Sequence, residues 1–307
     1  MSANANWERS VVPVDIAFIT VNYNTLECVS QLTSFFETLD VPFTFTFTVV
    51  DNDSKDGSRE FLQSHPGINY LQTGGNIGYG RAINRGVAAT ASKYVCVMNS
   101  DVILNRESLI QIWRFLEERH DAGVCAPRVT YEDGRSQGMV FLPSLFSHYA
   151  NWFGKILSRY AKVNIEKATA PLRVDGLLGA FFLIRRSVIP PPALFDEDFF
   201  FFLEDTALAH TLMNRAIQSF VIPGATIIHI GGKSSSADSV RFLYENKYLY
   251  LKKFYGPFHA NAVFFMDRAR ILRKWSLYSL FSLLTASERI KSKKQYYKVA
   301  WRTARLR

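Results

Sequence analysis

The chain has 307 residues, of which 48% are hydrophobic and 21% are charged, with a formal net charge of +9. This length and apolar fraction are enough for one large or two modest domains with a buried core, and they exclude a disordered protein. The charge is uneven: residues 259–307 contain 12 Lys and Arg against 2 Asp and Glu, whereas residues 1–258 contain 24 against 25. Because the body is near-neutral, we expect no specific nucleic-acid partner.

The cysteines and the N-terminus indicate a compartment. Cys28, Cys96 and Cys125 are too few and too scattered for a disulfide framework, which favours buried reduced thiols. The first 15 residues contain no apolar stretch of the kind found in a signal peptide, and no segment has the roughly 18 apolar residues that a spanning helix needs. We therefore expect a cytoplasmic chain.

The first half alternates between short β-branched apolar runs and helical spacing. Strands are expected at 16–21, 45–50, 68–72 and 94–98, and helices at 25–39, at 58–63 and at 79–89. Continuous apolar runs are typical of buried parallel strands, so this alternation predicts an α/β protein with a mostly parallel, doubly wound sheet and flanking helices.

The second half is less regular. It predicts helices at 107–119, 204–216 and 240–254, a strand at 123–129, an apolar run at 174–184, and short strands at 220–222 and 226–230. Residues 143–170 have mixed periodicity and are interpreted as a variable insertion.

Polar residues follow three of the predicted parallel strands. The strands end in Asn22-Tyr23-Asn24, in Asp51-Asn52-Asp53 and in Asn99-Ser100-Asp101. Ligands of such sheets bind outside the carboxyl ends of the strands, so the three clusters predict a site, although each one could also form an ordinary turn or helix cap.

Two residues are candidate metal ligands. Asp101 directly follows a buried strand, where a lone carboxylate suits Mg²⁺ or Mn²⁺ shared with substrate phosphates; the alternative is a cap for the next helix. His229 follows a later strand, and its imidazole would suit Mn²⁺, although a lone histidine is more often structural.

A glycine-rich segment at 74–86 opens a helix and could approach an anion, with Arg81 or Arg85 adding charge. It does not complete a dinucleotide-binding fingerprint, because Ile83 occupies a position that requires Gly or Ala.

An acidic pair lies at the end of an aromatic stretch. Glu204 and Asp205 follow four phenylalanines and a leucine, where partial desolvation could raise a carboxyl pKa toward that of a general base. The alternative is a favourable interaction with the helix dipole. The sequence contains no GxSxG, HExxH or Walker motif, which excludes those enzyme classes.

Seven motifs occur along the chain in this order: VNYN at 21–24, VVDNDSKDGS at 49–58, NIGYGRAINRG at 76–86, NSDV at 99–102, GLLGAFFLIRR at 176–186, FDEDFFFFLED at 195–205, and His229 with Gly-Gly-Lys-Ser at 231–234. Together they resemble the inverting family 2 glycosyltransferases with the GT-A fold, in particular the rhamnosyltransferase and galactofuranosyltransferase branch that builds bacterial surface polysaccharides. The resemblance covers roughly residues 14–255 and, together with the uneven charge, predicts an N-terminal tail at 1–13, a GT-A domain at 14–257, and a basic amphipathic helical extension at 258–307.

The resemblance also implies roles for individual residues. Asp205 is the expected catalytic base with Glu204 as its support, and Asp101 and His229 are the expected ligands of Mg²⁺ or Mn²⁺. The expected nucleotide-sugar site, in which Asp51 contacts the pyrimidine base, consists of Asn22, Asn24, Asp51, Asn52, Asn76, Gly78, Arg81, Asn84, Asn99 and Ser100.

The implied reaction transfers rhamnose or a hexose, with inversion, from a dTDP- or UDP-sugar to a saccharide or polyprenyl-linked acceptor. Two departures from the family pattern bear on it. Asn99 stands at the first position of the metal motif, and Ala207 and His210 stand where relatives often carry an acid and a base. A non-catalytic glycosyltransferase-like scaffold and a Rossmann-type oxidoreductase are the alternatives.

The basic C-terminal segment interleaves aromatic and basic side chains, as in an interfacial helix on an anionic bilayer. We expect residues 259–307 to bring the protein to the inner face of the plasma membrane as a peripheral protein. The alternatives are a helix packed on the body, a homo-oligomer contact, and a solvated or RNA-binding tail.

Overall fold

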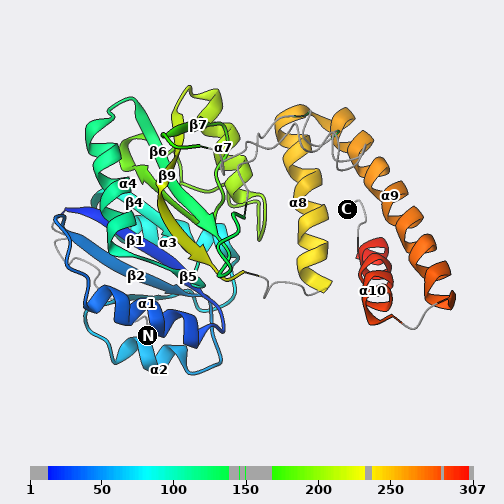
Figure 1. Cartoon of the computed structure of the whole chain (residues 1–307), viewed down its shortest axis with the longest axis horizontal. Helices are drawn as coiled ribbons and strands as arrows, with labels where there is room; N and C mark the ends of the chain where they lie inside the picture. Colours follow the sequence, from blue (N-terminus) through cyan, green and yellow to red (C-terminus); the bar gives the residue numbers. More distant parts are fainter. Residues whose placement is uncertain are drawn as a thin grey trace, which may run out of the picture.

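A computed structural model describes residues 13–137, 145, 149, 168–231, 237–284 and 287–303, so most of the expected insertion at 143–170 lies outside the described residues. A nine-stranded sheet forms the centre, in the order β3-β2-β1-β4-β8-β6-β9-β5, with β7 also paired to β9 (Figure 1). The strands are β1 (Val14–Asn22), β2 (Phe45–Asp51), β3 (Asn69–Gln72), β4 (Ser92–Met98), β5 (Val102–Ile103), β6 (Ala122–Thr130), β7 (Leu172–Val174), β8 (Phe181–Arg185) and β9 (Gln218–His229).

The half of the sheet that carries the predicted site is parallel. β1 pairs in parallel with both β2 and β4, and β2 pairs in parallel with β3. This register places Asn22 directly beside Asp51. β8 runs antiparallel to β4 and β6, and β6 is again parallel to β9. The predicted mostly parallel α/β sheet is confirmed.

Helices cover both faces of this sheet. One core joins the sheet to α1 (Leu26–Glu37), α2 (Ser58–Gln63) and α4 (Arg106–Glu118). The core on the other face joins it to α3 (Tyr79–Ala88) and α7 (Glu204–Asn214). Both cores exclude water from long runs of Val, Ile, Leu and Phe, which is the main favourable contribution to such a fold. The two layers leave the carboxyl ends of β1, β2 and β4 together at one edge.

Two segments of the second half are defined more closely by the structure than by the sequence. The apolar run at 174–184, to which the sequence assigns no element, contains the end of β7 and most of β8 around a loop with Gly179. The two short strands expected at 220–230 form one strand, β9, whose register against β6 shifts between Ile222 and Thr226. Pro223 lies in that interval, and a proline has no N–H to donate to the ladder.

Three helices, α8 (Ala237–Tyr255), α9 (Pro257–Leu284) and α10 (Glu288–Thr303), follow the sheet and lie beside the α/β body (Figure 1). Phe199 and Ala207 pack with Tyr250 and Leu251 of α8 and with Val263 of α9, which joins the extension to the body. A second small core joins α8, α9 and α10. Within the described ranges, none of the helices has the length and apolarity that crossing a membrane would require.

The short 3₁₀ turn η2 (Arg186–Val188) closes β8. The three cysteines are buried and form no disulfide, as expected.

Candidate active site

The end of β1 is tied to the end of β2 by a buried polar network. Asn22 Nδ2 donates to Asp51 Oδ1 and to Ser54 Oγ, both at 2.9 Å. Ser54 Oγ also accepts from the backbone N–H of Asn24 at 2.9 Å. Asn22 and Asp51 are fully buried, so in this structure both fix the loops at the strand ends, while Asn24 is exposed.

Asn52 organises the glycine-rich segment. Its Nδ2 donates to Asn76 Oδ1 at 3.0 Å, and its Oδ1 accepts from the backbone N–H of Ile77 at 3.0 Å. Gly78 has a φ of +90°, and a Cβ there would lie 2.5 Å from the backbone oxygen of Phe200. The segment thus permits a close backbone approach, and the chain that approaches Gly78 is the aromatic stretch before Glu204. The predicted approach to an anion stays a prediction.

A hydrogen-bond chain connects this network to the end of β4. Thr25 Oγ1 donates to Asn22 Oδ1 at 2.7 Å and lies 3.1 Å from Ser100 Oγ. The two groups of predicted residues, from β1–β2 and from β4, are therefore parts of one site.

Asp101 and His229 meet across the sheet, because β5 pairs with the end of β9. His229 Nε2 lies 3.3 Å from Asp101 Oδ1 and 3.2 Å from Asn99 Nδ2. The backbone N–H of Gly231 donates to Asp101 Oδ2 at 3.2 Å. Burial alone would raise the pKa of Asp101, but the contacts with His229 and Gly231 outweigh it and lower the pKa of this carboxyl. The alternative role of Asp101 as a helix cap does not apply, since Asn105 caps α4.

Gln137 determines which nitrogen of His229 faces the carboxylate. Its Nε2 donates to the backbone oxygen of His229 at 2.5 Å, so its Oε1 accepts a hydrogen bond from His229 Nδ1 at 2.9 Å. This contact fixes the orientation of the ring and leaves Nε2 as the nitrogen that faces Asp101. Among the described residues no group of three or more His, Cys, Asp or Glu side chains is arranged around a common point. A carboxylate and an imidazole with waters and phosphate oxygens nonetheless fit a Mg²⁺ or Mn²⁺ ion.

Asp205 lies in the first turn of α7 and is held by backbone donors. Its Oδ2 accepts from the N–H of Gly179 at 3.0 Å, and its Oδ1 accepts from the N–H of Thr206 at 2.6 Å. Burial raises the pKa of Asp205, and these donors oppose part of the rise because they stabilise the anion.

Glu204 has the opposite environment. It is 7% exposed, and its Oε2 has no hydrogen-bond partner in the described part of the chain. Burial, and next the negative charge of Asp205, raise its pKa to about 8. The two adjacent acids therefore differ in what stabilises them: backbone donors stabilise the ionised form of Asp205, whereas burial favours the neutral form of Glu204.

The buried phenol of Tyr79, the first residue of α3, is affected by the charges of three acids of the candidate site. Burial raises the pKa of its phenol well above the usual value, and the charges of Glu204, Asp205 and Asp101 add to the rise. The negative charges of the acidic pair and of Asp101 therefore all act on the same buried phenol.

Two other predicted residues have structural partners. Arg81 Nε donates to the backbone oxygen of Glu197 at 2.9 Å. Asn84 Nδ2 donates to the backbone oxygen of Phe195 at 2.8 Å, and Asn84 Oδ1 accepts from the N–H of Phe195 at 2.9 Å. In this structure both residues attach α3 to the loop that leads to the acidic pair.

The family model described as Glycosyl transferase family 2 matches residues 19–189, which is more than half of the chain. The chain belongs to this family. It is therefore a glycosyltransferase, and the resemblance inferred from its motifs is confirmed.

Among curated proteins, it is 27% identical over 226 residues to N-acetylglucosaminyl-diphospho-decaprenol L-rhamnosyltransferase of Mycobacterium tuberculosis, covering 66% of this chain and 73% of that protein. Two solved structures confirm the GT-A fold. The mannosyltransferase PcManGT from Pyrobaculum calidifontis, in complex with GDP-Man and Mn²⁺, has a TM-score of 0.56 at 14% identity and covers 94% of this chain and 86% of its own. GalNAc-T7 with UDP, GalNAc and Mn²⁺ has a TM-score of 0.54 at 13% identity and covers 78% of this chain and 50% of its own.

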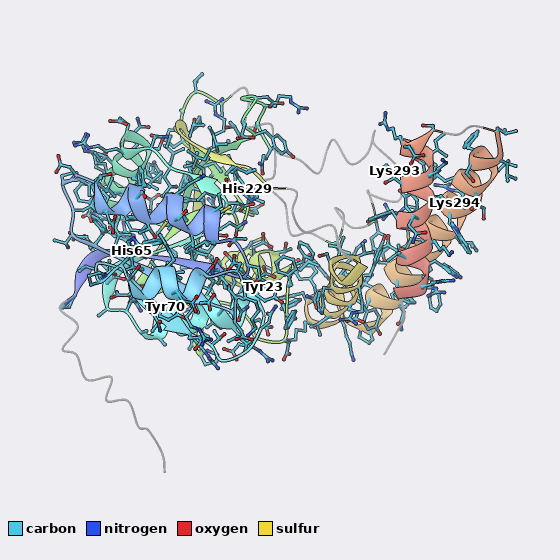
Figure 2. All side chains as sticks on the ribbon, turned by 90° about the horizontal axis from the view of Figure 1, so that it is seen from below. Tyr23, His65, Tyr70, His229, Lys293 and Lys294 are labelled. Carbon is cyan, nitrogen blue, oxygen red and sulfur yellow. The ribbon has the colours of Figure 1, made fainter. Side chains whose placement is uncertain are left out.

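Several groups of the candidate site were not identified as such from the sequence. Thr25 and Gln137 contact Ser100 and His229, which are distant in the sequence, so no spacing rule links them. Gly179 lies within the quoted motif at 176–186, but the contact of its backbone N–H with Asp205 is visible only in the structure. Tyr23 could have been predicted as a site residue, because it lies between the predicted residues Asn22 and Asn24 at the end of a strand. This tyrosine is 49% exposed there, which suits stacking of its ring on a flat ligand (Figure 2).

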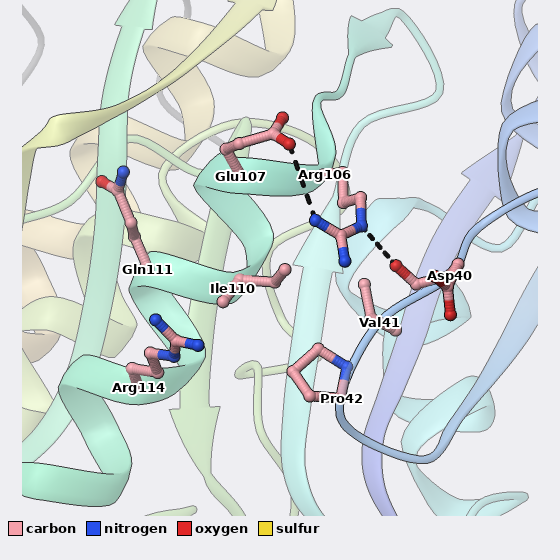
Figure 3. A pocket seen from close by; sticks show the side chains of 8 residues that line it. All are labelled: Asp40, Val41, Pro42, Arg106, Glu107, Ile110, Gln111 and Arg114. Carbon is pink, nitrogen blue, oxygen red and sulfur yellow. Dashed lines mark hydrogen bonds and ion pairs between the residues drawn. The ribbon is translucent and has the colours of Figure 1, made fainter.

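A cleft of ≈ 490 Å³ lies away from this site, between the loop before β2 and the start of α4 (Figure 3). Arg106 is engaged there, because its Nε donates to the backbone oxygen of Asp40 at 2.5 Å and its Nη1 lies 3.7 Å from Glu107 Oε1. The cleft is lined by none of the predicted site residues, and we assign it no part in the reaction; its lining is Asp40, Val41, Pro42, Arg106, Glu107, Ile110, Gln111 and Arg114.

Proposed function

We propose that this glycosyltransferase moves rhamnose or a hexose from a nucleotide diphosphate sugar to a saccharide acceptor, with inversion and with the help of a divalent metal. The observation that carries the proposal is the acidic pair, in which Asp205 is held by backbone donors while Glu204 Oε2 has no partner among the described residues. One ionised carboxylate beside a neutral one suits a single displacement with one base.

Asp101 and His229 are the residues that would hold Mg²⁺ or Mn²⁺, and Gln137 would orient His229. The ion would supply positive charge that stabilises the leaving diphosphate. The proposal is supported by the Mn²⁺ present in the complexes of PcManGT and GalNAc-T7.

The donor nucleotide would bind at the carboxyl ends of β1 and β2. Asn24 and Asn76 are exposed there, and Tyr23 offers an aromatic face. Asp51 is fully buried, so a direct contact between its carboxylate and the base would require the loop at 52–57 to move. Asn22, Asn52 and Ser100 would act by holding the loops that line this site.

Asp205 would remove the proton from the acceptor hydroxyl, which then attacks the anomeric carbon from the face opposite the diphosphate. Its raised pKa strengthens it as a base, while the N–H groups of Gly179 and Thr206 fix its direction. Glu204, neutral beside it, would keep a second negative charge away from the attacking oxygen.

The acceptor is proposed to be lipid-linked, as the name of the mycobacterial relative states for that protein. The extension provides a surface that fits this proposal. Exposed apolar side chains cluster at the end of α9, in a group that we call the apolar tip: Leu277, Leu280, Phe281, Leu283 and Leu284.

Basic residues follow the apolar tip directly, including Lys293 and Lys294 on α10 (Figure 2). Leu283 and Leu284 are 80% and 76% exposed. Contact of these apolar side chains with water is unfavourable, and their insertion into a bilayer interface would be favourable. The proposed location is the cytoplasmic face of the plasma membrane, where anionic lipids would attract the basic extension.

The proposed function is tested by incubating the full chain with a panel of UDP-, dTDP- and GDP-sugars, Mn²⁺ or Mg²⁺, and saccharide and polyprenyl-linked acceptors. Transfer from one donor, with the anomeric configuration inverted in the product by NMR, is the expected result. Donor binding without transfer or hydrolysis would favour a scaffold, and NAD(P) binding would favour an oxidoreductase.

A further inference from the structure

The five residues that precede the acidic pair form a strained turn, which we call the aromatic turn (Phe199–Leu203). Phe202 has a φ of 73° and Leu203 a φ of 68°. Both lie in the left-handed region that bulky L-residues rarely adopt, and two such residues in succession persist only where surrounding contacts impose the conformation. Leu203 is also the N-cap of α7, so the strain lies directly against Glu204 and Asp205.

Asn246 of α8 holds this strained backbone. Its Nδ2 donates to the carbonyl oxygen of Phe201 at 2.8 Å and to that of Phe202 at 3.1 Å. The residue is 6% exposed, so these bonds form in a nearly water-free environment where an unpaired carbonyl is costly. One amide group therefore satisfies two consecutive carbonyls at the point where the chain turns into α7.

Further contacts hold the aromatic turn and the residues directly before it. The backbone N–H of Tyr79 donates to the carbonyl oxygen of Phe200 at 2.9 Å, from the N-terminus of α3. The ring of Phe200 stacks on Phe242 of α8 at 4.7 Å between centroids. Lys253, two turns after Asn246 on α8, lies 2.7 Å from Asp196 and 2.5 Å from Asp198.

We propose that Asn246 is a positioning residue for transfer: it holds the aromatic turn so that the first turn of α7 presents Asp205 to the acceptor. The inference rests on the proposed role of Asp205 as the base. It follows because the N–H of Ala207 donates to the carbonyl oxygen of Leu203 at 2.8 Å, so the backbone at 202–203 sets the direction of α7. A change in that direction would move Asp205 away from the Gly179 N–H, and misplacement by about 1 Å can cost about 100-fold in rate.

The test compares Asn246→Ala with Asn261→Ala. Asn261 is a matched asparagine at the start of α9, and its Oδ1 accepts a hydrogen bond from the hydroxyl of Tyr248 at 3.1 Å. We expect Asn246→Ala to lower kcat by about 10- to 100-fold while the donor Kd stays within about twofold of wild type. Rates are divided by the folded fraction, measured by circular dichroism, so that simple unfolding does not count as a loss. Asn261→Ala should retain the wild-type kcat.

A rescue experiment separates positioning from general destabilisation. In the Asn246→Ala chain, Phe202→Gly should recover part of kcat, because glycine adopts a positive φ without steric cost. Phe202→Ala removes the same ring without relieving the strain and should recover nothing. If Asn246→Ala does not fold, Asn246→Ser replaces it, since one hydroxyl cannot reach both carbonyls and kcat should still fall.

The outcomes distinguish this inference from the function on which it rests. Turnover retained by Asp205→Asn would show that the proposed base is wrong. An inactive Asp205→Asn together with a wild-type kcat in Asn246→Ala or Asn246→Ser would overturn the positioning role alone. Equal recovery by Phe202→Gly and Phe202→Ala would also overturn it.

Discussion

Glu204 and Asp205 are adjacent in the chain, yet their carboxyl groups have opposite environments. Asp205 Oδ2 accepts the N–H of Gly179 at 3.0 Å, whereas Glu204 Oε2 is buried without a partner in the described chain. This difference favours the proton of the pair on Glu204 and supports the proposal that Asp205 is the base. Both acids lie in the first turn of α7, where the helix dipole favours negative charge. Because the dipole acts on both carboxyl groups, it does not explain why their environments differ.

The contact between Gly179 and Asp205 can be tested by a small substitution. A Cβ at Gly179 would lie 2.9 Å from Asp205 Oδ2, so Gly179→Ala must displace the carboxylate. The atoms that such a Cβ meets all belong to the Asp205 side chain and none to the backbone, so we expect a smaller effect on melting temperature than on kcat, which should fall by about 10- to 100-fold. Gly67→Ala is the control, because nothing lies within 4 Å of its Cβ. Normal turnover in Gly179→Ala would argue against this placement of the base.

The protonation of Glu204 makes stability depend on pH. Its pKa is about 8 in the folded chain against an ordinary 4.5, so the folded state holds the proton more tightly than the unfolded state does. The stability from this group is fully present below about pH 4.5 and is lost as the pH rises through about 8. Between those two values the free energy of unfolding should fall by roughly 1 kcal/mol for each pH unit. Denaturant unfolding between pH 5 and pH 9 should show this decline.

Glu204→Gln should flatten that pH dependence, because a neutral amide has no proton to lose. The matched change Glu197→Gln alters an exposed acid of the neighbouring loop and should leave the wild-type decline in place. The same decline in the Glu204→Gln chain would assign it to another group.

Gln137 is predicted to affect metal binding without being a ligand. Loss of the hydrogen bond to His229 Nδ1 in Gln137→Leu should weaken Mn²⁺ affinity by about 10- to 100-fold, measured by calorimetry with donor nucleotide present. Asp101→Ala should weaken Mn²⁺ binding further. Thr130, whose hydroxyl bonds to the backbone of β9, offers a control in Thr130→Val, which keeps the shape and should bind normally. Unchanged Mn²⁺ affinity in Asp101→Ala would show that Asp101 is not a metal ligand.

The apolar tip is predicted to carry membrane binding. Deleting residues 259–307 would be a poor test, because Val263 belongs to the core shared with the body. Leu283→Asp with Leu284→Asp should instead reduce co-sedimentation with anionic liposomes by about tenfold or more, because two exposed apolar side chains become charged. Met213→Asp changes an exposed side chain of α7 and should bind normally. Equal sedimentation of all three proteins would contradict the membrane proposal and favour a protein partner for the tip.

Much of the fold could be predicted from the sequence, because the relevant signals are local. The buried parallel strands are continuous apolar runs, and polar residues follow them directly, so the ends of β1, β2 and β4 were located within about two residues. The division between β7 and β8 was missed, since an apolar run interrupted by glycines has the same pattern whether it forms one strand or two.

The site could be predicted only in part, for a physical reason. Asp205 and Asp101 follow recognisable strand and helix boundaries. Asn246 lies 41 positions after Asp205 in a tyrosine-rich helix and acts through two backbone carbonyls, so no spacing rule links them. Similarly, the burial of Asp51 depends on Asn22 and Ser54 packing around it, which the sequence does not specify.

The most direct test of the central claim is the steady-state rate and donor affinity of Asp205→Asn. The amide has nearly the same shape but cannot accept the acceptor proton, so kcat should fall by about 100- to 10,000-fold while the donor Kd stays near wild type. Asp133→Asn, a change in an exposed acid paired with Arg135, should leave both values unchanged. Turnover by Asp205→Asn at a rate close to wild type would contradict the assignment of Asp205 as the base.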